Sequence, residues 1–373
     1  MSSLFEPATI GTMTLRNRFV RSATWEGLAT PEGVVTPRLV ETIAALAKGG
    51  VGLIISGHAY VQPEGQAGPF QMGVHKDELI PGLKAMATAA HDHGAKMVLQ
   101  LAHAGYIAAT NLTGSLPLAV SASVKLGDIP CREVTAADIQ GLVSAFAGAA
   151  ARAKDAGLDG VQIHSAHGYF LNQFLSPLFN RRTDEFGGNL HNRTWVHIEI
   201  LKAIRLAVGN DYPVLIKLNG RDFVEGGLEV QEAAEAAALM EAAGLNAVEV
   251  SGGMARFSPV GAARQAISNQ KKEAYHQEEA KVFKQQIKIP LILVGGIRSL
   301  PVAERLVEEG VCDFISMSRP FIREPDLINR WRSGDRRKAA CTSDNLCFGP
   351  ARSGEGIYCV TAAKKRRTAA KKA

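Results

Sequence analysis

Two histidines and a tyrosine lie close together in His164-Ser165-Ala166-His167-Gly168-Tyr169, directly after a short apolar run. Imidazole N–H groups can hold a carbonyl or nitro oxygen and so polarise a conjugated double bond, while a phenol can supply a proton. A zinc site and a purely structural histidine pair are the alternatives. The spacing is not that of a helical His-x-x-x-His pair, and no thiol or carboxylate stands at ligand spacing, so we expect no metal here.

A second candidate site combines two glycines with an arginine. Gly295 and Gly296 end the run Leu291–Gly296, and Ser318 and Arg319 end the run Phe314–Arg319 some twenty residues later. Glycines let backbone N–H groups approach phosphate oxygens, and a guanidinium can close a bidentate contact. The pattern predicts a site for a phosphorylated ligand, unless the glycines only turn the chain.

Short apolar segments rich in Val and Ile recur along the chain, each followed by a loop and a segment with helical spacing of apolar residues. We predict strands at Phe19–Ser22, Val51–Ser56, Lys96–Leu101, Gly160–His164, Val214–Leu218, Ala247–Ser251, Leu291–Val294 and Phe314–Met317. Apolar strands that alternate with helices favour a parallel sheet, and eight such units favour an α/β fold of the single (β/α)8 TIM-barrel type. A doubly wound open sheet is the alternative, but Val20–Gly27 lacks its Gly-x-Gly-x-x-Gly turn.

Barrel enzymes keep their chemistry at the carboxyl ends of the strands, and the polar residues of this sequence gather there. Gln100 lies at the end of the third predicted strand, His164 at the end of the fourth and Lys217 at the end of the fifth. Four long insertions also follow strands, at 60–73, 105–133, 168–190 and 256–275. We expect some of them to enclose a substrate.

Charge and composition narrow the function classes. The net charge of +6 comes from the basic residues of 361–373, a segment without apolar periodicity that we expect to be disordered. We expect residues 1–360 to form one domain. Outside that segment the acidic and basic residues balance, which argues against a nucleic-acid partner. The sequence has neither a membrane-length apolar run nor a secretory signal, and its five cysteines describe no disulfide framework, so we expect a cytoplasmic protein. Assembly into a homo-oligomer stays open.

Several segments resemble the Old Yellow Enzyme family of FMN-dependent ene-reductases, over residues 4 to about 360. They are Asn17-Arg18-Phe19-Val20, Gln100–Gly105, the long signature Gly160–Pro177 and Arg182–Gly188. Their order and spacing make the resemblance specific. It implies FMN as cofactor, NADH or NADPH as reductant, and a small electrophilic alkene as substrate.

The resemblance also implies roles for single residues. Gln100 contacts the pyrimidine edge of the flavin, and Lys217 stands where many relatives place an arginine beside flavin N1 and O2. His164 and His167 anchor the substrate, with Tyr169 as proton donor. Gly296 and Arg319 fall on the phosphate-binding positions, and we expect Gly295 and Ser318 beside them to contact the cofactor as well.

The segment after the first strand departs from the family pattern. Relatives carry a Thr or Cys there that contacts flavin O4, whereas this chain has Ala23, Thr24 and Trp25. Either Thr24 reaches that atom or Trp25 takes its place. Substrate identity is not inherited with the fold.

A cysteine loop near the C-terminus resembles the iron–sulfur loop of the dienoyl-CoA reductase and trimethylamine dehydrogenase branch. Cys341, Cys347 and Cys359 match ligand positions of that loop, but Asp344 stands at the second one. A carboxylate is a harder ligand than a thiolate, so we expect residues 341–359 to be a degenerate loop without an intact four-iron cluster.

The sequence therefore predicts an NAD(P)H:flavin oxidoreductase that reduces enones, enals or nitroalkenes by ping-pong hydride transfer. Two other phosphate-binding barrels are alternatives. A dihydrouridine synthase would need a basic body and an RNA-binding module, and the sequence shows neither. A phosphosugar isomerase or aldolase would need a reactive base, for which Lys217 is the one suggestive residue.

Overall fold

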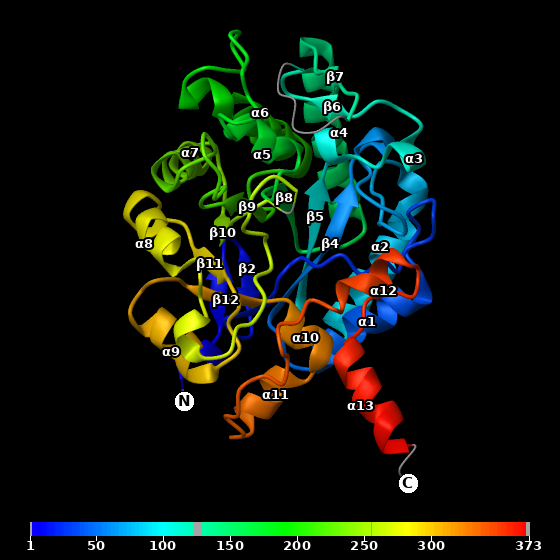
Figure 1. Cartoon of the computed structure of the whole chain (residues 1–373), viewed down its shortest axis with the longest axis vertical. Helices are drawn as coiled ribbons and strands as arrows, with labels where there is room; N and C mark the ends of the chain where they lie inside the picture. The colour runs from blue at the N-terminus through cyan, green and yellow to red at the C-terminus, as the bar shows by residue number, and fades with distance from the viewer. Residues whose placement is uncertain (1, 123–128, 255, 371–373) are drawn as a thin grey trace.

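Eight parallel strands close into a barrel in the computed structural model, which describes residues 2–122, 129–254 and 256–370 (Figure 1). In barrel order starting from the first along the chain, the strands are β3 (Phe19–Arg21), β4 (Leu53–Tyr60), β5 (Lys96–Ala102), β8 (Gly160–Ser165), β9 (Val214–Asn219), β10 (Ala247–Ser251), β11 (Leu291–Val294) and β12 (Phe314–Met317). Each predicted strand is present, and the fold is a single (β/α)8 barrel.

Helices alternate with these strands and cover the barrel. They are α1 (Pro37–Lys48), α2 (Ile80–His91), α4 (Ala136–Asp155), α6 (Leu190–Val208), α7 (Val230–Ala242), α8 (Gln277–Gln286) and α9 (Leu300–Glu308), with α10 (Arg319–Arg323) and α11 (Leu327–Arg332) after the last strand. Several begin at residues suited to capping. Thr135 and Asp138 form a capping box on α4, which satisfies backbone N–H groups that the first helical turn leaves free.

A short N-terminal hairpin, which the sequence did not predict, packs against one end of the barrel. It consists of β1 (Ala8–Ile10) and β2 (Met13–Leu15), paired antiparallel. Ile10, Met13 and Leu15 pack with apolar residues from the strands in one buried cluster. The hairpin therefore closes one end of the barrel with apolar side chains. Polar side chains gather at the opposite end.

The four insertions carry short elements of their own. The second one contains α3 (Thr110–Thr113) and the two-stranded sheet of β6 (Leu118–Ala119) and β7 (Arg132–Glu133), and its residues 123–128 lie outside the described part of the chain. The third contains α5 (Phe170–Leu175), whose residues are all buried. These elements follow strands, as predicted.

The C-terminal segment forms α12 (Phe348–Arg352) and α13 (Val360–Ala370). The prediction of a disordered tail is wrong for the residues of α13, although 371–373 lie outside the described residues. Alanine, lysine and arginine are strong helix formers, so the segment can be helical without an apolar stripe. Only Ala362 of this helix is buried, and Figure 1 shows the helix projecting from the body. No helix of the described residues is long and apolar enough to cross a membrane.

Gly49, directly after helix α1, packs against Pro325, which precedes α11, and this close contact can be tested. A Cβ added at Gly49 would lie 1.8 Å from the Pro325 carbonyl oxygen, whereas one added at Gly141 in α4 would meet nothing within 4 Å. We expect Gly49→Ala to lower the free energy of unfolding by about 1–3 kcal/mol through overpacking. Gly141→Ala should raise it by about 0.5–1 kcal/mol, because alanine is the better helix former. Urea denaturation measures both, and an equal effect of the two would contradict the close approach.

Candidate functional site

A cavity of about 640 Å³ opens at the carboxyl ends of the barrel strands. That size is typical of sites for small molecules and cofactors. Its walls contain these residues: Ala23, Trp25, His58, Ala67, Gly68, Pro69, Gln100, Ile107, His164, His167, Tyr169, Lys217, Arg256, Phe257, Ala262 and Arg352. Seven of the residues singled out from the sequence therefore lie around one space.

The predicted catalytic residues converge on this cavity from the end of β8 and the loop after it. The ring centroids of His164 and Tyr169 lie 4.4 Å apart, and those of His164 and His167 lie 5.5 Å apart. His167 Nε2 lies 2.7 Å from Ser251 Oγ. His164 Nδ1 is buried without a hydrogen-bond partner in the described residues, so it is free to bind a ligand atom.

Both histidines are neutral at neutral pH. Burial lowers the pKa of His164 well below its ordinary value, and the positive charges that His167, His58 and Lys217 can carry lower it further. Burial and Lys217 act in the same direction on the pKa of His167. Each ring therefore offers one N–H donor and one lone pair, which suits an uncharged carbonyl or nitro oxygen.

His58 also lines the cavity, although the sequence analysis did not single it out. It lies in β4, after a register shift between β4 and β5 that falls between Ile55 and His58. Such an irregularity re-aims a side chain. The imidazole stacks between Trp25 and His164, with ring centroids 6.4 and 6.3 Å away.

Gln100 and Lys217 join a buried polar network inside the barrel. Gln100 Nε2 donates to Gln162 Oε1 at 2.7 Å, and Gln162 Nε2 donates to Glu249 Oε2 at 3.0 Å. The Lys217 ammonium lies 3.2 Å from Glu249 Oε1 and donates to Ser22 Oγ at 2.8 Å. The sequence analysis missed Glu249, whose signal was a carboxylate in the middle of the apolar strand β10.

The protonation state of Glu249 follows from this network. Burial pushes the pKa of its carboxyl upward, but the Lys217 ammonium and hydrogen bonds from Ser22, Gln162 and Ser316 outweigh burial and leave the pKa below its ordinary value. The pair is therefore a buried carboxylate with a buried ammonium.

The residues after β3 divide between the cavity and the wall behind it. Ala23 and Trp25 line the cavity. The Thr24 hydroxyl instead donates to the Ser22 carbonyl at 2.9 Å and lies 2.7 Å from Ser318 Oγ. Of the two alternatives for this segment, Trp25 is the one whose side chain borders the open space.

The predicted phosphate residues lie beside this cavity rather than in its wall. Gly296 faces the ring of Tyr275, and a Cβ added to it would lie 2.7 Å from that ring. Arg319 is only 6% exposed and donates to the Arg264 carbonyl at 2.8 Å and to Asn345 Oδ1 at 2.7 Å. Among the described residues its guanidinium has no acidic partner. A buried cation without a counter-charge is costly, so the chemistry of this site fits a phosphate monoester such as that of FMN.

The cysteine loop lies near Arg319 but forms no metal centre among the described residues: no three His, Cys, Asp or Glu side chains are arranged to hold an ion. The Asp344 carboxylate accepts hydrogen bonds from the hydroxyls of Thr342 at 2.7 Å and Thr361 at 2.6 Å. Both hydroxyls donate to Oδ2, and Leu346 N donates to Oδ1 at 3.0 Å, so both oxygens are engaged within the protein. That the loop lacks an intact cluster stays a prediction.

Comparison with known proteins gives a family match over most of the chain. The model of the NADH:flavin oxidoreductase / NADH oxidase family matches residues 3–338. A metal reductase of Desulforamulus reducens is 41% identical over 337 residues, which are 90% of this chain and 49% of that protein. The chain spans about half the length of this relative and of the next one, an NADH oxidase of Thermoanaerobacter brockii (54%).

Solved structures agree with the family match. A complex of 2-naphthoyl-CoA reductase with 2-naphthoyl-CoA superimposes with a TM-score of 0.90 at 32% identity, covering 96% of this chain and 56% of that one. An old yellow enzyme homologue from Zymomonas mobilis superimposes with a TM-score of 0.76 at 26% identity, covering 91% and 96%.

The buried ion pair generates a stability prediction. Glu249→Gln leaves the Lys217 ammonium buried without a counter-charge, so we expect the free energy of unfolding to fall by about 3–5 kcal/mol. Adding Lys217→Met removes that charge and should restore part of the loss. Urea denaturation at neutral pH measures both proteins. If the double variant were less stable than Glu249→Gln, the pair would not be the reason.

Proposed function

The chain belongs to the NADH:flavin oxidoreductase / NADH oxidase family, and from this premise we propose that it binds FMN, takes electrons from NADH or NADPH and reduces activated carbon–carbon double bonds. Enones, enals and nitroalkenes are the substrate class. The two half-reactions alternate in one cavity, which is a ping-pong scheme. The observation that carries this proposal is the convergence of His164, His167 and Tyr169 on the cavity that Gln100 and Lys217 also line.

The residues present suit the two ends of the cofactor. The Gln100 amide and the Lys217 ammonium would hold its ring system, and Arg319 with the glycines at 295 and 296 would hold its phosphate. Bound FMN supplies the two-electron chemistry, accepting hydride from the nicotinamide and delivering it to carbon. The protein contributes position and electrostatics.

Three side chains act on the substrate in this proposal. The neutral N–H groups of His164 and His167 donate hydrogen bonds to the carbonyl or nitro oxygen, which draws electron density from the double bond. Tyr169 gives its hydroxyl proton to the α-carbon. Trp25 and Phe257 add apolar wall to the cavity, which helps to exclude water from the reacting carbons.

A visible spectrum of the purified protein tests the assignment. We expect a yellow protein with one non-covalent FMN per chain, whose flavin absorbance is bleached by NADH or NADPH and restored by an enone under anaerobic conditions. A colourless protein that FMN cannot reconstitute would contradict the cofactor. A flavin that NAD(P)H bleaches but no alkene reoxidises would contradict the substrate class alone.

Tyr169→Phe separates the two half-reactions. Removing the hydroxyl should slow alkene-dependent reoxidation by roughly 10²- to 10⁴-fold, the usual size of lost general acid catalysis, while flavin reduction by NAD(P)H changes little. Stopped-flow absorbance measures each half-reaction separately. Equal slowing of both would mean that Tyr169 only supports the structure of the cavity.

A further inference from the structure

The hydrogen bonds of His58 define which of its nitrogens carries a proton. Gln71 Nε2 lies 2.8 Å from His58 Nδ1, and Tyr169 Oη lies 3.0 Å from His58 Nε2. The orientation of the Gln71 amide is set by its other contacts: its oxygen accepts from Ala67 N at 2.7 Å, and its nitrogen donates to the His58 carbonyl at 3.2 Å. Gln71 therefore donates to Nδ1, which must carry a lone pair.

A neutral imidazole has one N–H, so the hydrogen of His58 is on Nε2 and is donated to the Tyr169 oxygen. Burial lowers the pKa of His58 to about 4, which keeps the ring neutral at neutral pH. The Tyr169 hydroxyl thus accepts a hydrogen bond from His58. Its own hydrogen finds no acceptor among the described residues and is left for a molecule in the cavity.

The same contact bears on Tyr169 after its proton has left. Burial raises the pKa of Tyr169 far above its ordinary value, and the charge of Arg256 opposes that effect. A phenolate in this environment needs a hydrogen-bond donor, and the His58 Nε2–H already lies at the required distance. Stabilisation of this kind acts where charge develops during the reaction.

We propose that His58, held by Gln71, is a positioning residue that turns the Tyr169 hydroxyl so that its proton faces the substrate, and that it donates a hydrogen bond to the phenolate that remains. The proposal rests on the function proposed above. In the step concerned, the O–H bond of Tyr169 breaks and a C–H bond forms at the substrate α-carbon. The hydride that completes the reduction comes from the flavin chemistry already assigned.

Nitrogen NMR of the protein labelled with ¹⁵N-histidine tests the proton position without any turnover. At neutral pH we expect the His58 signals to report a protonated Nε2 and an unprotonated Nδ1, with the assignment made by their loss in His58→Gln. A proton on Nδ1 would overturn the proposal, because Tyr169 would then donate to His58 rather than to the substrate.

Two variants test the catalytic consequence. His58→Leu removes the N–H, whereas His58→Gln keeps an amide donor at similar reach. We expect the ratio of alkene-dependent to ferricyanide-dependent flavin reoxidation to fall roughly 10-fold or more in His58→Leu and to recover partly in His58→Gln, because only the alkene needs a proton from Tyr169. A ratio that His58→Leu leaves unchanged would overturn the proposal. A wild-type protein that reduces no alkene would instead contradict the proposed function, and the NMR result would still decide the position of the proton.

An independent observation concerns the charge of the cavity wall. Among the described residues that line it, the charged ones are Lys217, Arg256 and Arg352, and none is acidic. Lys217 is neutralised from behind by Glu249. Neither arginine has an acidic partner in the described part of the chain, so two positive charges stay uncompensated at the cavity.

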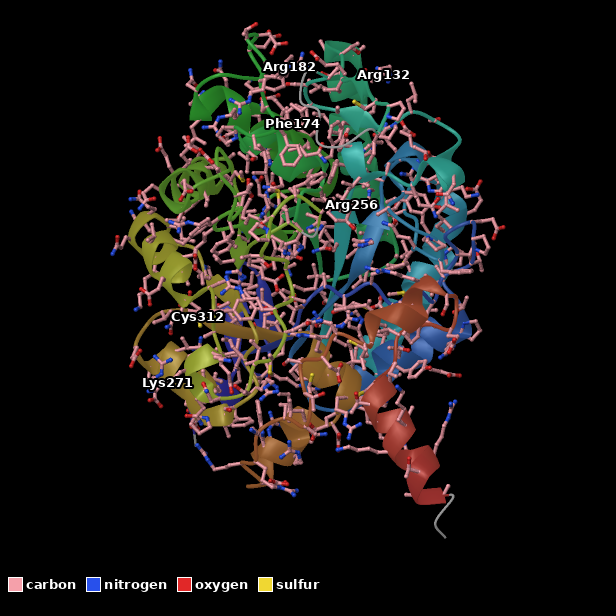
Figure 2. All side chains as sticks on the ribbon, viewed as in Figure 1. Arg132, Phe174, Arg182, Arg256, Lys271 and Cys312 are labelled. Carbon is pink, nitrogen blue, oxygen red and sulfur yellow. The ribbon has the colours of Figure 1, made fainter. Side chains whose placement is uncertain are left out.

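Separate segments bring these two arginines to the cavity. Arg256 follows β10, and Figure 2 labels it in the middle of the molecule; its charge reaches the Tyr169 hydroxyl. Arg352 ends α12, in the segment beyond the family match. That segment contacts the loop after β3. Ile357 N donates to the Glu26 carbonyl at 2.8 Å, and a Cβ added at Gly27 would lie 2.4 Å from the Ala351 carbonyl oxygen.

We infer that Arg256 and Arg352 bind an anionic oxygen group of a molecule in this cavity. Two sources share that chemistry: a carboxylate on the alkene substrate and a phosphate of the nicotinamide nucleotide. Exposed ion pairs are worth little each, but two arginines on one cavity without an acidic neighbour give a field of one sign.

Paired ligands distinguish the two sources. Calorimetry compares 4-hydroxybenzoate with its methyl ester, and flavin reduction gives the KM for NADPH. We expect Arg256→Gln and Arg352→Gln each to weaken binding of one of the two anions roughly 2- to 5-fold, the range of an exposed ion pair, and to leave binding of the neutral ester unaffected. Arg366→Gln in the exposed helix α13 is the matched control. If the binding of neither anion is weakened, or if binding of the ester is weakened as much as that of the acid, the inference is wrong. The calorimetric measurement does not depend on turnover.

Discussion

The ion pair between Lys217 and Glu249 is the interaction on which the polar end of the barrel depends. Both groups are buried, and removing two charges from water costs several kcal/mol per ion unless hydrogen bonds satisfy what the pair leaves over. The hydroxyls of Ser22 and Ser316 and the amide of Gln162 supply those bonds. Ser22 directly follows β3, whereas Gln162 lies in β8 and Ser316 in β12, so the hydrogen bonds to one carboxylate connect separate parts of the barrel beside the cavity.

Charge is arranged in layers along the barrel axis as a result. Apolar residues of the N-terminal hairpin and the strands fill one end, and the network around Glu249 lies above them. The cavity above that network is lined by histidines that burial keeps neutral and by arginines without acidic partners in the described residues. The neutral histidines suit an uncharged carbonyl or nitro oxygen on the reacting part of a ligand. The arginines suit an anionic group elsewhere on the same ligand.

Much of the fold could be predicted from the sequence because each strand is a local apolar run. His164, Lys217 and Gln100 lie at the carboxyl ends of such strands, which a parallel barrel brings to one face. The partners that complete the site could not be found in the same way. His58 acts through Gln71 and Tyr169, residues that only the closed barrel brings to it. Arg352 reaches the cavity because the C-terminal segment folds back, which no local pattern indicated. The helix α13 could not be found from apolar periodicity, because it forms from residues of high helix propensity without an apolar stripe.

The backbone at His167 shows what the arrangement of the two histidines demands. His167 has a φ of 62°, in the left-handed region that residues other than glycine rarely adopt. Its N–H donates to Asn219 Oδ1 at 3.0 Å, and Asn219 is itself held by Asp222 at 2.8 Å. Strain of this kind persists only where surrounding contacts impose it. The loop must leave β8 and, within three residues, return a second imidazole beside the first; the left-handed residue makes that return, and the end of β9 stabilises it.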